Sequence, residues 1–159
     1  GICLGAQLLA RALGATVQPH PAGLAEIGYF AVQPTEAGQT VFETPLQVYH
    51  WHREGFTLPA GAELLATGAN FPHQAYRYGA NAFGLQFHPE VDQIILERWL
   101  LEGAEELTAP GAQSAAEQRV RHADHDAALD RWFDGFLDGC FVSSTAPGCR
   151  NRRYPCSGG

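Results

Sequence analysis

The feature that most restricts the fold is the first segment, Gly-Ile-Cys-Leu-Gly at residues 1–5, which leads into residues of helix-forming composition up to Leu13. Gly-x-Cys-x-Gly is the thiol version of the nucleophile elbow, a sharp strand-to-helix turn that exposes a reactive side chain. The two glycines are expected because a side chain at either position would crowd the turn. The positive end of the helix favours thiolate over thiol at Cys3. The segment therefore predicts a candidate nucleophile, although an ordinary tight turn can have the same residues.

A mixed α/β domain is expected from the segments that follow. Strands are predicted where β-forming residues are enriched, with apolar and polar side chains alternating most clearly at 46–51: they are residues 26–32, 46–51, 63–67, 73–78 and 82–87. Residues 17–25 and 52–61 contain prolines and glycines and are expected to form loops.

Helices are expected at three places. The first follows the elbow and ends near Gly14, which suits a left-handed cap. The second begins after Asp92, a good N-cap, and its buried stripe is predicted to contain Ile95, Leu96, Trp99 and Leu100. The third covers residues 114–137, with apolar side chains near helical spacing at Ala116, Val120, Ala123, Ala127, Phe133 and Phe136.

A histidine and a carboxylate lie two positions apart at the end of the last predicted strand. The strand period of two puts Gln86, His88 and Glu90 on one face. A carboxylate in this position can fix the tautomer of the imidazole and stabilise its protonated form. Pro89 cannot donate to a sheet, so strand pairing should end here. A surface His-Pro-Glu turn is the alternative, but a thiol nucleophile needs such a base.

Three segments resemble the signature blocks of class I glutamine amidotransferases, closest to the amidotransferase domain of GMP synthase and its stand-alone relatives. The segments are GICLGAQLLARALG, VYHWHREGFTLPAGAELLATG and AFGLQFHPEV, and the likeness covers about residues 1–101. The resemblance implies a flavodoxin-like α/β fold, glutamine as the substrate, and no cofactor. Trp51 and Arg53 are bulkier than the residues that many relatives have at the corresponding positions.

The resemblance also implies a catalytic triad. Cys3 would attack the side-chain amide of glutamine, which gives a γ-glutamyl thioester and ammonia. His88 would be the general acid and base, and Glu90 would orient it. The ammonia would pass to a synthetase domain or subunit, because the chain has no nucleotide-binding loop.

Four further residues are implied in substrate binding. The backbone N–H of Leu4 would donate to the oxyanion, as expected of the group next to the nucleophile. Gln7 matches a glutamine that helps to bind the substrate. Trp51 and His52 lie in the strand end whose backbone holds the α-amino acid end of the substrate.

The same resemblance predicts that part of the domain lies upstream of residue 1. The sequence contains no Met, and the Gly-rich loop that supplies the second oxyanion donor would precede the elbow. We therefore expect a partial amidotransferase domain at residues 1–107, a helical extension at 108–142 and a disordered tail at 143–159. Two alternatives stay open: a catalytically silent binding domain, and a γ-glutamyl hydrolase or peptidase that uses the same triad.

Charge and composition exclude other classes of function. The chain has 17 acidic residues against 10 arginines, which argues against a nucleic-acid partner. No apolar run approaches the roughly 20 residues that span a bilayer. The cysteines lack CxxC spacing and no signal peptide is visible, so the cytoplasm is the expected compartment, with Cys140, Cys149 and Cys156 inert.

A metal site is a further alternative. His50 and His52 lie on one strand face, with Glu54 and His73 nearby in the sequence, and these residue types bind Zn²⁺ or Fe²⁺. The amidotransferase resemblance accounts for His52 without a metal, so none is predicted. The polar cluster from His122 to Asp126 is expected to be solvated on a helix face.

Overall fold

The computed structural model describes residues 1–141, and the predicted tail with Cys149 and Cys156 lies outside them. The helices are α1 (Leu4–Ala12), α2 (Gln93–Glu102) and α3 (Ala115–Phe141), with 3₁₀ turns η1 (Ala37–Thr40) and η2 (Ala104–Thr108). The strands are β1 (Val17–Pro19), β2 (Glu26–Pro34), β3 (Leu46–His52), β4 (Glu54–Phe56), β5 (Ala62–Thr67), β6 (Ala75–Tyr78) and β7 (Ala82–Leu85). No helix within residues 1–141 is long and apolar enough to cross a membrane.

Five strands form one sheet in the order β3-β2-β5-β6-β7, and every neighbouring pair is antiparallel. Residues 1–3 extend this sheet at β7, where Ile2 forms a parallel bridge with Leu85. The Leu85 amide donates to the Gly1 carbonyl at 2.9 Å, and the Cys3 amide donates to the Leu85 carbonyl at 2.7 Å. The chain therefore passes from an extended segment beside β7 directly into α1, as the elbow motif predicts.

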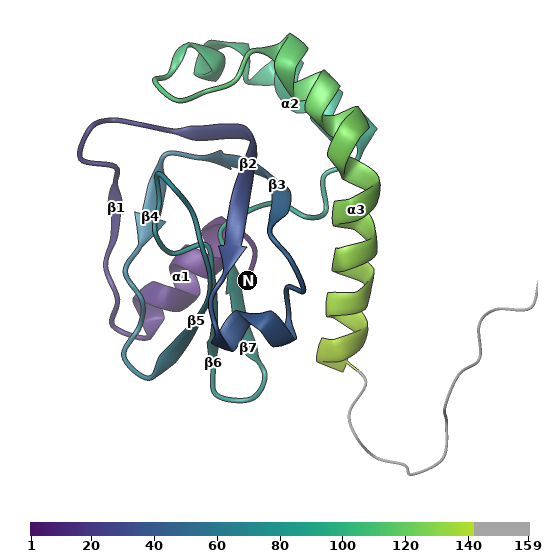
Figure 1. The fold of residues 1–159 in the computed structure, drawn as a ribbon. Helices are drawn as coiled ribbons and strands as arrows, with labels where there is room; N and C mark the ends of the chain where they lie inside the picture. Colours follow the sequence, from purple (N-terminus) through teal and green to yellow (C-terminus); the bar gives the residue numbers. More distant parts are fainter. Residues whose placement is uncertain (142–159) are drawn as a thin grey trace, which may run out of the picture.

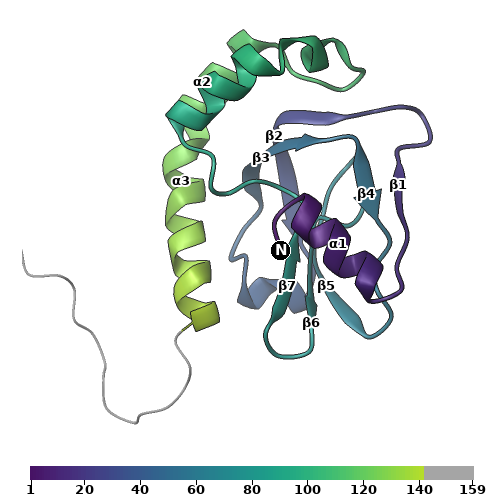
Figure 2. The same cartoon turned by 180° about the vertical axis from the view of Figure 1, so that it is seen from behind.

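The sheet separates two apolar cores. Successive side chains of a strand point to opposite faces, so Ala75 and Tyr76 of β6 belong to different cores. Tyr76 packs with Ala6 and Ala10 of α1, while Ala75 belongs to the larger core with Leu129 of α3. Figures 1 and 2 show α1 lying over β5, β6 and β7, with α3 running beside β2 and β3.

Helix α2 agrees with its prediction. The Asp92 carboxylate accepts a hydrogen bond from the Ile95 amide at 2.8 Å, which satisfies one of the free N–H groups of the first turn. Leu96 and Leu100 are buried, and Ile95 and Trp99 pack against the larger core. The helix follows residues 88–90 directly and therefore fixes the position of the predicted base.

Two predicted loops contain a short two-stranded ribbon instead. Strand β1 pairs with β4 in antiparallel register, with Val17 opposite Phe56. Three residues are too few to show an alternating pattern, so no strand could be predicted there. The ribbon lies beside α1 and carries the backbone carbonyl of Glu54, which takes part in the site described below.

The first half of helix α3 buries a different side from the predicted one, whereas Phe136 in the second half packs against the larger core as predicted. Val120 is 62% exposed, whereas Gln118 and His122 are buried. Tyr29 and Tyr49 of the sheet explain this, because the Tyr49 hydroxyl donates to Oε1 of Gln118 at 2.8 Å and the Tyr29 hydroxyl lies 2.7 Å from Nδ1 of His122. The prediction of a solvated cluster is therefore wrong for His122. Buried polar groups of this kind are paired, and their partners come from distant strands.

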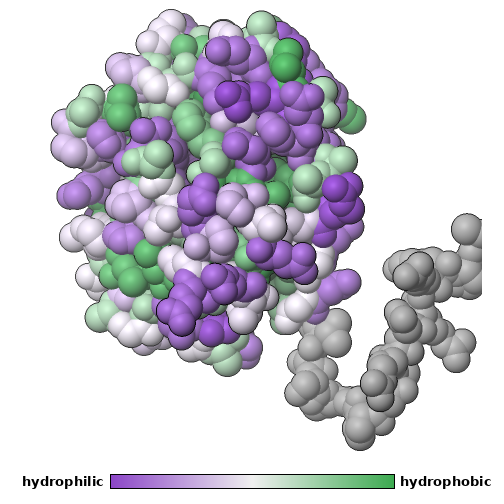
Figure 3. Space-filling model, in the orientation of Figure 1, coloured by the Kyte–Doolittle hydropathy of each residue, from purple (hydrophilic) through white to green (hydrophobic). Residues whose placement is uncertain are grey.

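The surface in the orientation of Figure 1 mixes hydrophilic and hydrophobic residues (Figure 3). Exposed large apolar side chains of the described residues are scattered over several elements: Leu4, Leu8, Tyr78, Ile94, Leu101 and Val120. Single exposed apolar residues are ordinary on protein surfaces and do not mark a docking site.

Candidate active site

Cys3 has a strained backbone at the turn between the β7 edge and α1. Its dihedral angles are φ 45° and ψ −106°, and among residues 1–141 it is the one residue other than glycine with a positive φ. Such a conformation costs on the order of 1–3 kcal/mol and is frequent at functional sites. This geometry is that of a nucleophile elbow, which holds the side chain away from its own backbone.

The flanking glycines have different roles. A Cβ on Gly1 would lie 2.6 Å from the carbonyl group of Gly5, so no larger residue fits there without moving the turn. A Cβ on Gly5 would meet nothing within 4 Å. The expectation that both glycines prevent crowding is therefore correct at Gly1 and wrong at Gly5 in this chain.

The backbone N–H of Leu4 is free at the start of α1. Among the backbone hydrogen bonds of residues 1–141, none has this amide as its donor, whereas the Gly5 amide donates to the Ile2 carbonyl at 2.8 Å. The side chain of Leu4 is 63% exposed and does not cover the site. A free amide next to a cysteine at a helix N-terminus can stabilise a negatively charged oxygen.

His88 and Glu90 form a close pair beside this turn. Nδ1 of His88 donates to Oε1 of Glu90 at 2.7 Å, and the His88 amide donates to the Tyr49 carbonyl at 2.7 Å. The ring of Trp99 stands perpendicular to the imidazole, with 4.9 Å between the ring centroids. The His88 ring is therefore held by a carboxylate on one side and an indole on another.

The charges around His88 favour its protonated form. Burial alone would lower its pKa, but hydrogen bonds and charges from Cys3 and Glu90 outweigh burial and raise the pKa of His88 to about 9. An imidazolium between a thiolate and a carboxylate is an arrangement that can pass a proton to a leaving group.

Gln86 contacts the sulfur, and Gln7 contacts Gln86. Nε2 of Gln86 lies 3.7 Å from Sγ of Cys3, and Oε1 of Gln86 accepts from Nε2 of Gln7 at 3.3 Å. Gln7 is buried, and its amide nitrogen also donates to the Glu54 carbonyl at 3.0 Å. The strand period predicts that Gln86 shares a face with His88. This could have indicated a role for Gln86 in the site, but none was predicted.

Trp51 borders the site on the side of α2. Its carbonyl oxygen lies 4.0 Å from Sγ of Cys3, and its indole packs perpendicular to Trp99 at 5.7 Å between centroids. Trp51, Trp99, Glu102 and Gly103 line a shallow hollow of about 290 Å³. The Trp51 indole therefore packs on Trp99, the ring that also stands against His88.

His52 is buried below the site. Its Nδ1 donates to the Glu54 carbonyl at 2.9 Å, and its Nε2 lies 3.0 Å from Nδ1 of His50 and 3.2 Å from Oε2 of Glu26. Within residues 1–141, Glu26, His50 and His52 form the one group of three whose ligand atoms all lie within 4.8 Å of one another. His73 is elsewhere, since its Nδ1 lies 2.8 Å from the Phe56 carbonyl. The grouping of the two histidines with Glu54 and His73 is therefore wrong, and Glu26 takes their place.

The fold and this geometry define an α/β domain with a cysteine on a nucleophile elbow and a hydrogen-bonded His–Glu pair beside it. The model of the family described as glutamine amidotransferase class-I matches residues 1–98. This match covers more than half of the 159 residues. The chain belongs to the class I glutamine amidotransferase family and has its mixed α/β, flavodoxin-like fold.

Similar proteins agree with this assignment. The glutamine amidotransferase-like protein YfeJ of Salmonella typhimurium is 38% identical over 129 residues, which are 76% of this chain and 53% of YfeJ. A GMP synthase (glutamine-hydrolyzing) of Thermomicrobium roseum is 34% identical over 142 residues, which are 82% of this chain and 26% of that protein. The chain thus spans about half of YfeJ and about a quarter of the synthase.

Solved structures show the same fold. A glutamine amidotransferase from Thermotoga maritima superposes with a TM-score of 0.79 at 30% identity, over 90% of this chain and 62% of that one. A glutamine amidotransferase from Methylobacillus flagellatus gives a TM-score of 0.83 at 28% identity, over 97% of this chain and 66% of that one. Helix α3 lies beyond residues 1–98 of the family match, yet these superpositions extend past that range.

Proposed function

We propose that the chain releases ammonia from the side chain of glutamine through a thioester on Cys3. The observation that carries this proposal is the position of the His88–Glu90 pair, hydrogen-bonded at 2.7 Å, next to a cysteine on a strained elbow. Cys3 is far from His88 and Glu90 in the sequence, yet it interacts with His88, and a thiol, an imidazole and a carboxylate are the groups that covalent amide hydrolysis needs.

In the first half of the reaction, the Cys3 thiolate attacks the side-chain amide carbon and a C–S bond forms. The carbonyl oxygen becomes negatively charged and accepts from the Leu4 amide, which has no backbone acceptor among the described residues. His88 gives its proton to the amide nitrogen, the C–N bond breaks, and ammonia leaves. Glu90 holds the imidazolium in the donating orientation.

In the second half, water attacks the γ-glutamyl thioester. His88, now neutral, takes a proton from this water, the C–S bond breaks, and glutamate leaves with Cys3 as thiolate again. Trp51 and Trp99 form the wall along which the α-amino acid end of the substrate lies. The His52 side chain is buried, so in this scheme His52 takes part through the backbone of its strand end.

The ammonia is passed to a synthetase domain or subunit in this proposal. The GMP synthases among the relatives support it, since their name describes a synthase that hydrolyses glutamine. A free thiol nucleophile also fits the reducing cytoplasm.

A glutamine-like diazoketone tests the proposed function directly. We expect the reagent to occupy the glutamine site, where its diazo carbon takes a proton and the Cys3 thiolate displaces N₂ from that carbon, which leaves a stable C–S bond to the methylene group. Peptide-level mass spectrometry separates this adduct from any on Cys140, and excess glutamine should suppress the adduct at Cys3 alone. A folded chain that gives no adduct at Cys3 would instead support a catalytically silent binding domain. Turnover of γ-glutamyl peptides but not of glutamine would support a hydrolase or peptidase.

Substitution of Glu90 by glutamine is expected to shift the pH profile of ammonia release. Protonated His88 is the proton donor, so the wild-type rate should fall as pH rises through about 9. Loss of the carboxylate lowers the pKa of His88, so this fall should move to lower pH, with a rate reduction of roughly 10²-fold at neutral pH. The measurement is the rate of ammonia release between about pH 6 and about pH 10.

The raised pKa of His88 also predicts that the free energy of unfolding depends on pH. The folded pKa of His88 is raised, so its contribution to the free energy of unfolding is fully present below the unfolded pKa of 6.5 and is lost as pH rises through about 9.

Glu97→Gln is the matched control for the pH profile of ammonia release, since it removes one surface carboxylate of α2 that pairs with Arg119. An unchanged profile in Glu90→Gln, or an equal shift in Glu97→Gln, would contradict the orienting role of Glu90.

A further inference from the structure

A buried charged cluster lies below Cys3 and has no part in the mechanism above. Glu26, His50 and His52 are buried, and Oε2 of Glu26 lies 3.4 Å from Nδ1 of His50 and 3.2 Å from Nε2 of His52. Nε2 of Gln74 donates to the same carboxylate oxygen at 2.8 Å. Within residues 1–141, Nε2 of His50 and Oε1 of Gln74 are buried without a hydrogen-bond partner. Buried atoms without a partner cost stability, so a buried ionic cluster of this kind is weak evidence for a stabilising role.

The protonation of the cluster follows from its surroundings. Burial alone would raise the pKa of Glu26, but contacts with His52, His50 and Gln74 outweigh burial and lower it. Burial lowers the pKa of His50 to about 3. The cluster thus contains an ionised carboxylate next to a neutral His50 at physiological pH.

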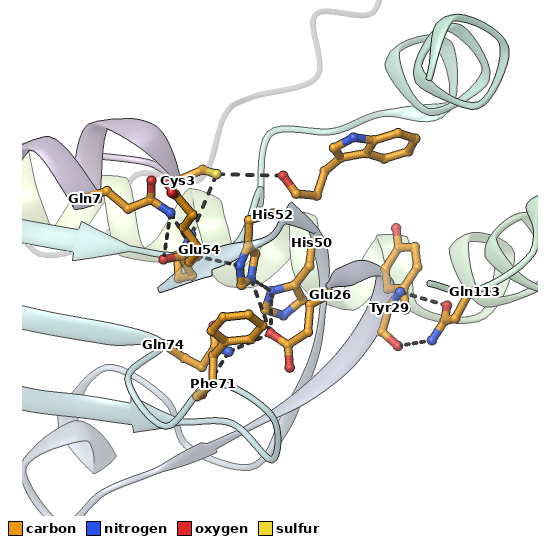
Figure 4. A network of polar contacts seen from close by, with 12 residues as sticks. Cys3, Gln7, Glu26, Tyr29, His50, His52, Glu54, Phe71, Gln74 and Gln113 are labelled. Atoms are coloured by element: carbon orange, nitrogen blue, oxygen red, sulfur yellow. Dashed lines mark hydrogen bonds and ion pairs between the residues drawn. The ribbon is translucent and has the colours of Figure 1, made fainter. Parts of the chain in front are cut away.

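The Glu54 carbonyl connects this cluster to the site. A carbonyl oxygen only accepts, so Nδ1 of His52 must carry the hydrogen in the 2.9 Å contact. The Glu26 carboxylate also only accepts, so Nε2 of His52 donates to it in the 3.2 Å contact. The same carbonyl accepts from Nε2 of Gln7 at 3.0 Å. Figure 4 shows Gln7 and His52 both reaching this oxygen, with Glu26 on the far side of His52 and Cys3 next to the Gln7 amide.

The orientation of Gln7 then decides the orientation of Gln86. Nε2 of Gln7 donates to Oε1 of Gln86 at 3.3 Å, so the amide nitrogen of Gln86 must turn the other way. On that side it lies 3.7 Å from Sγ of Cys3. An N–H group pointing at sulfur stabilises a thiolate more than a thiol, because hydrogen bonds to charged groups are the stronger ones.

We propose that Glu26 and His52 are positioning residues, which act through the Glu54 carbonyl and Gln7 to aim the amide of Gln86 at the Cys3 sulfur. The catalytic importance of this series of contacts rests on the proposed function, in which the thiolate is the nucleophile. The series of contacts itself can be tested without any glutamine turnover.

The test is the pH dependence of Cys3 alkylation by iodoacetamide, read for each cysteine by mass spectrometry of peptides. In Glu26→Gln the alkylation rate of Cys3 at neutral pH should fall about three- to tenfold, since the thiolate loses the benefit of about one hydrogen bond. The pH of half-maximal rate should rise by about half to one unit. Gln86→Met, which removes the donor and keeps the volume, should show the same change.

The double variant tests whether Glu26 and Gln86 act through one series of contacts or independently. Glu26→Gln combined with Gln86→Met should lower the alkylation rate of Cys3 no further than Gln86→Met alone, because both changes act through one donor. Additive losses would overturn the proposal. If Glu26→Gln does not fold, Gln7→Met breaks the same series of contacts above the buried cluster and should give the same shift.

A matched control removes a different buried polar contact from the same strand. Tyr29→Phe deletes the hydroxyl paired with His122 and should lower stability without moving the alkylation profile of Cys3. A shift in Tyr29→Phe equal to that in Glu26→Gln would show a general loosening and would overturn the proposal. One zinc or iron ion per purified chain would overturn it as well, since a metal would then hold His52. A shifted alkylation profile in a chain without glutaminase activity would refute the proposed function and leave this inference standing.

Discussion

Replacement of Cys3 by alanine is expected to reduce ammonia release from glutamine on the order of 10⁴-fold or more, because the covalent intermediate cannot form. The fold should be retained. The backbone bonds of the turn do not involve the side chain, since the Cys3 amide donates to Leu85 and its carbonyl accepts from Gln7 at 3.0 Å. The measurement is the initial rate of ammonia formation, with circular dichroism to confirm the folded state.

Cys140 gives the matched control for this substitution. It is a partly buried free cysteine near the end of α3, and Cys140→Ala should leave the glutaminase rate within about twofold of wild type. A Cys3→Ala protein that keeps more than a few per cent of the rate would refute the assignment of the nucleophile.

Replacement of Gly38 by alanine is expected to lower the free energy of unfolding by about 3 kcal/mol or more. Gly38 is buried in η1, and a Cβ there would collide with the Leu65 carbonyl oxygen and lie 2.6 Å from the Leu65 carbonyl carbon. Both atoms belong to the backbone of β5, so the turn itself must move. Phe42 follows this turn, is 1% exposed and stacks on Trp132 at 4.8 Å between centroids, so the larger core would be disturbed as well.

Gly135 separates this steric effect from the general effect of glycine replacement. It lies in α3, and a Cβ there would meet nothing within 4 Å. Gly135→Ala should raise stability by about 0.5–1 kcal/mol, because alanine favours a helix interior. Urea denaturation of the two variants measures both effects. A Gly38→Ala protein as stable as wild type would show that η1 can move away from β5 without cost.

Local patterns in the sequence predicted the elements that position the candidate active site. The elbow at Cys3, the start of α2 after Asp92 and the contact between His88 and Glu90 all depend on residues a few positions apart. Periodicity and capping preferences describe such short distances well. The same rules missed β1 and β4, which are too short to show a period.

Contacts between distant segments could not be predicted. Glu26 faces His52 only because β2 pairs with β3 in this register, and one residue of slip would turn it to the other face. Gln118 and His122 are buried because two tyrosines of the sheet supply their partners. A polar residue in a helix is normally expected to face water, so the apolar residues in the first half of α3 indicated the wrong side.

The pairing of residues 1–3 with β7 has a consequence for chain length in this part of the domain. Leu85 holds the backbone of Cys3, Gln86 faces its sulfur, and His88 and Glu90 follow within the next five positions. One inserted or deleted residue here would exchange the side chains that face the thiol, since neighbours along an extended chain point in opposite directions. Length variation among related proteins should therefore collect in exposed turns such as residues 79–81, and the segment from Leu85 to Glu90 should keep its number of residues.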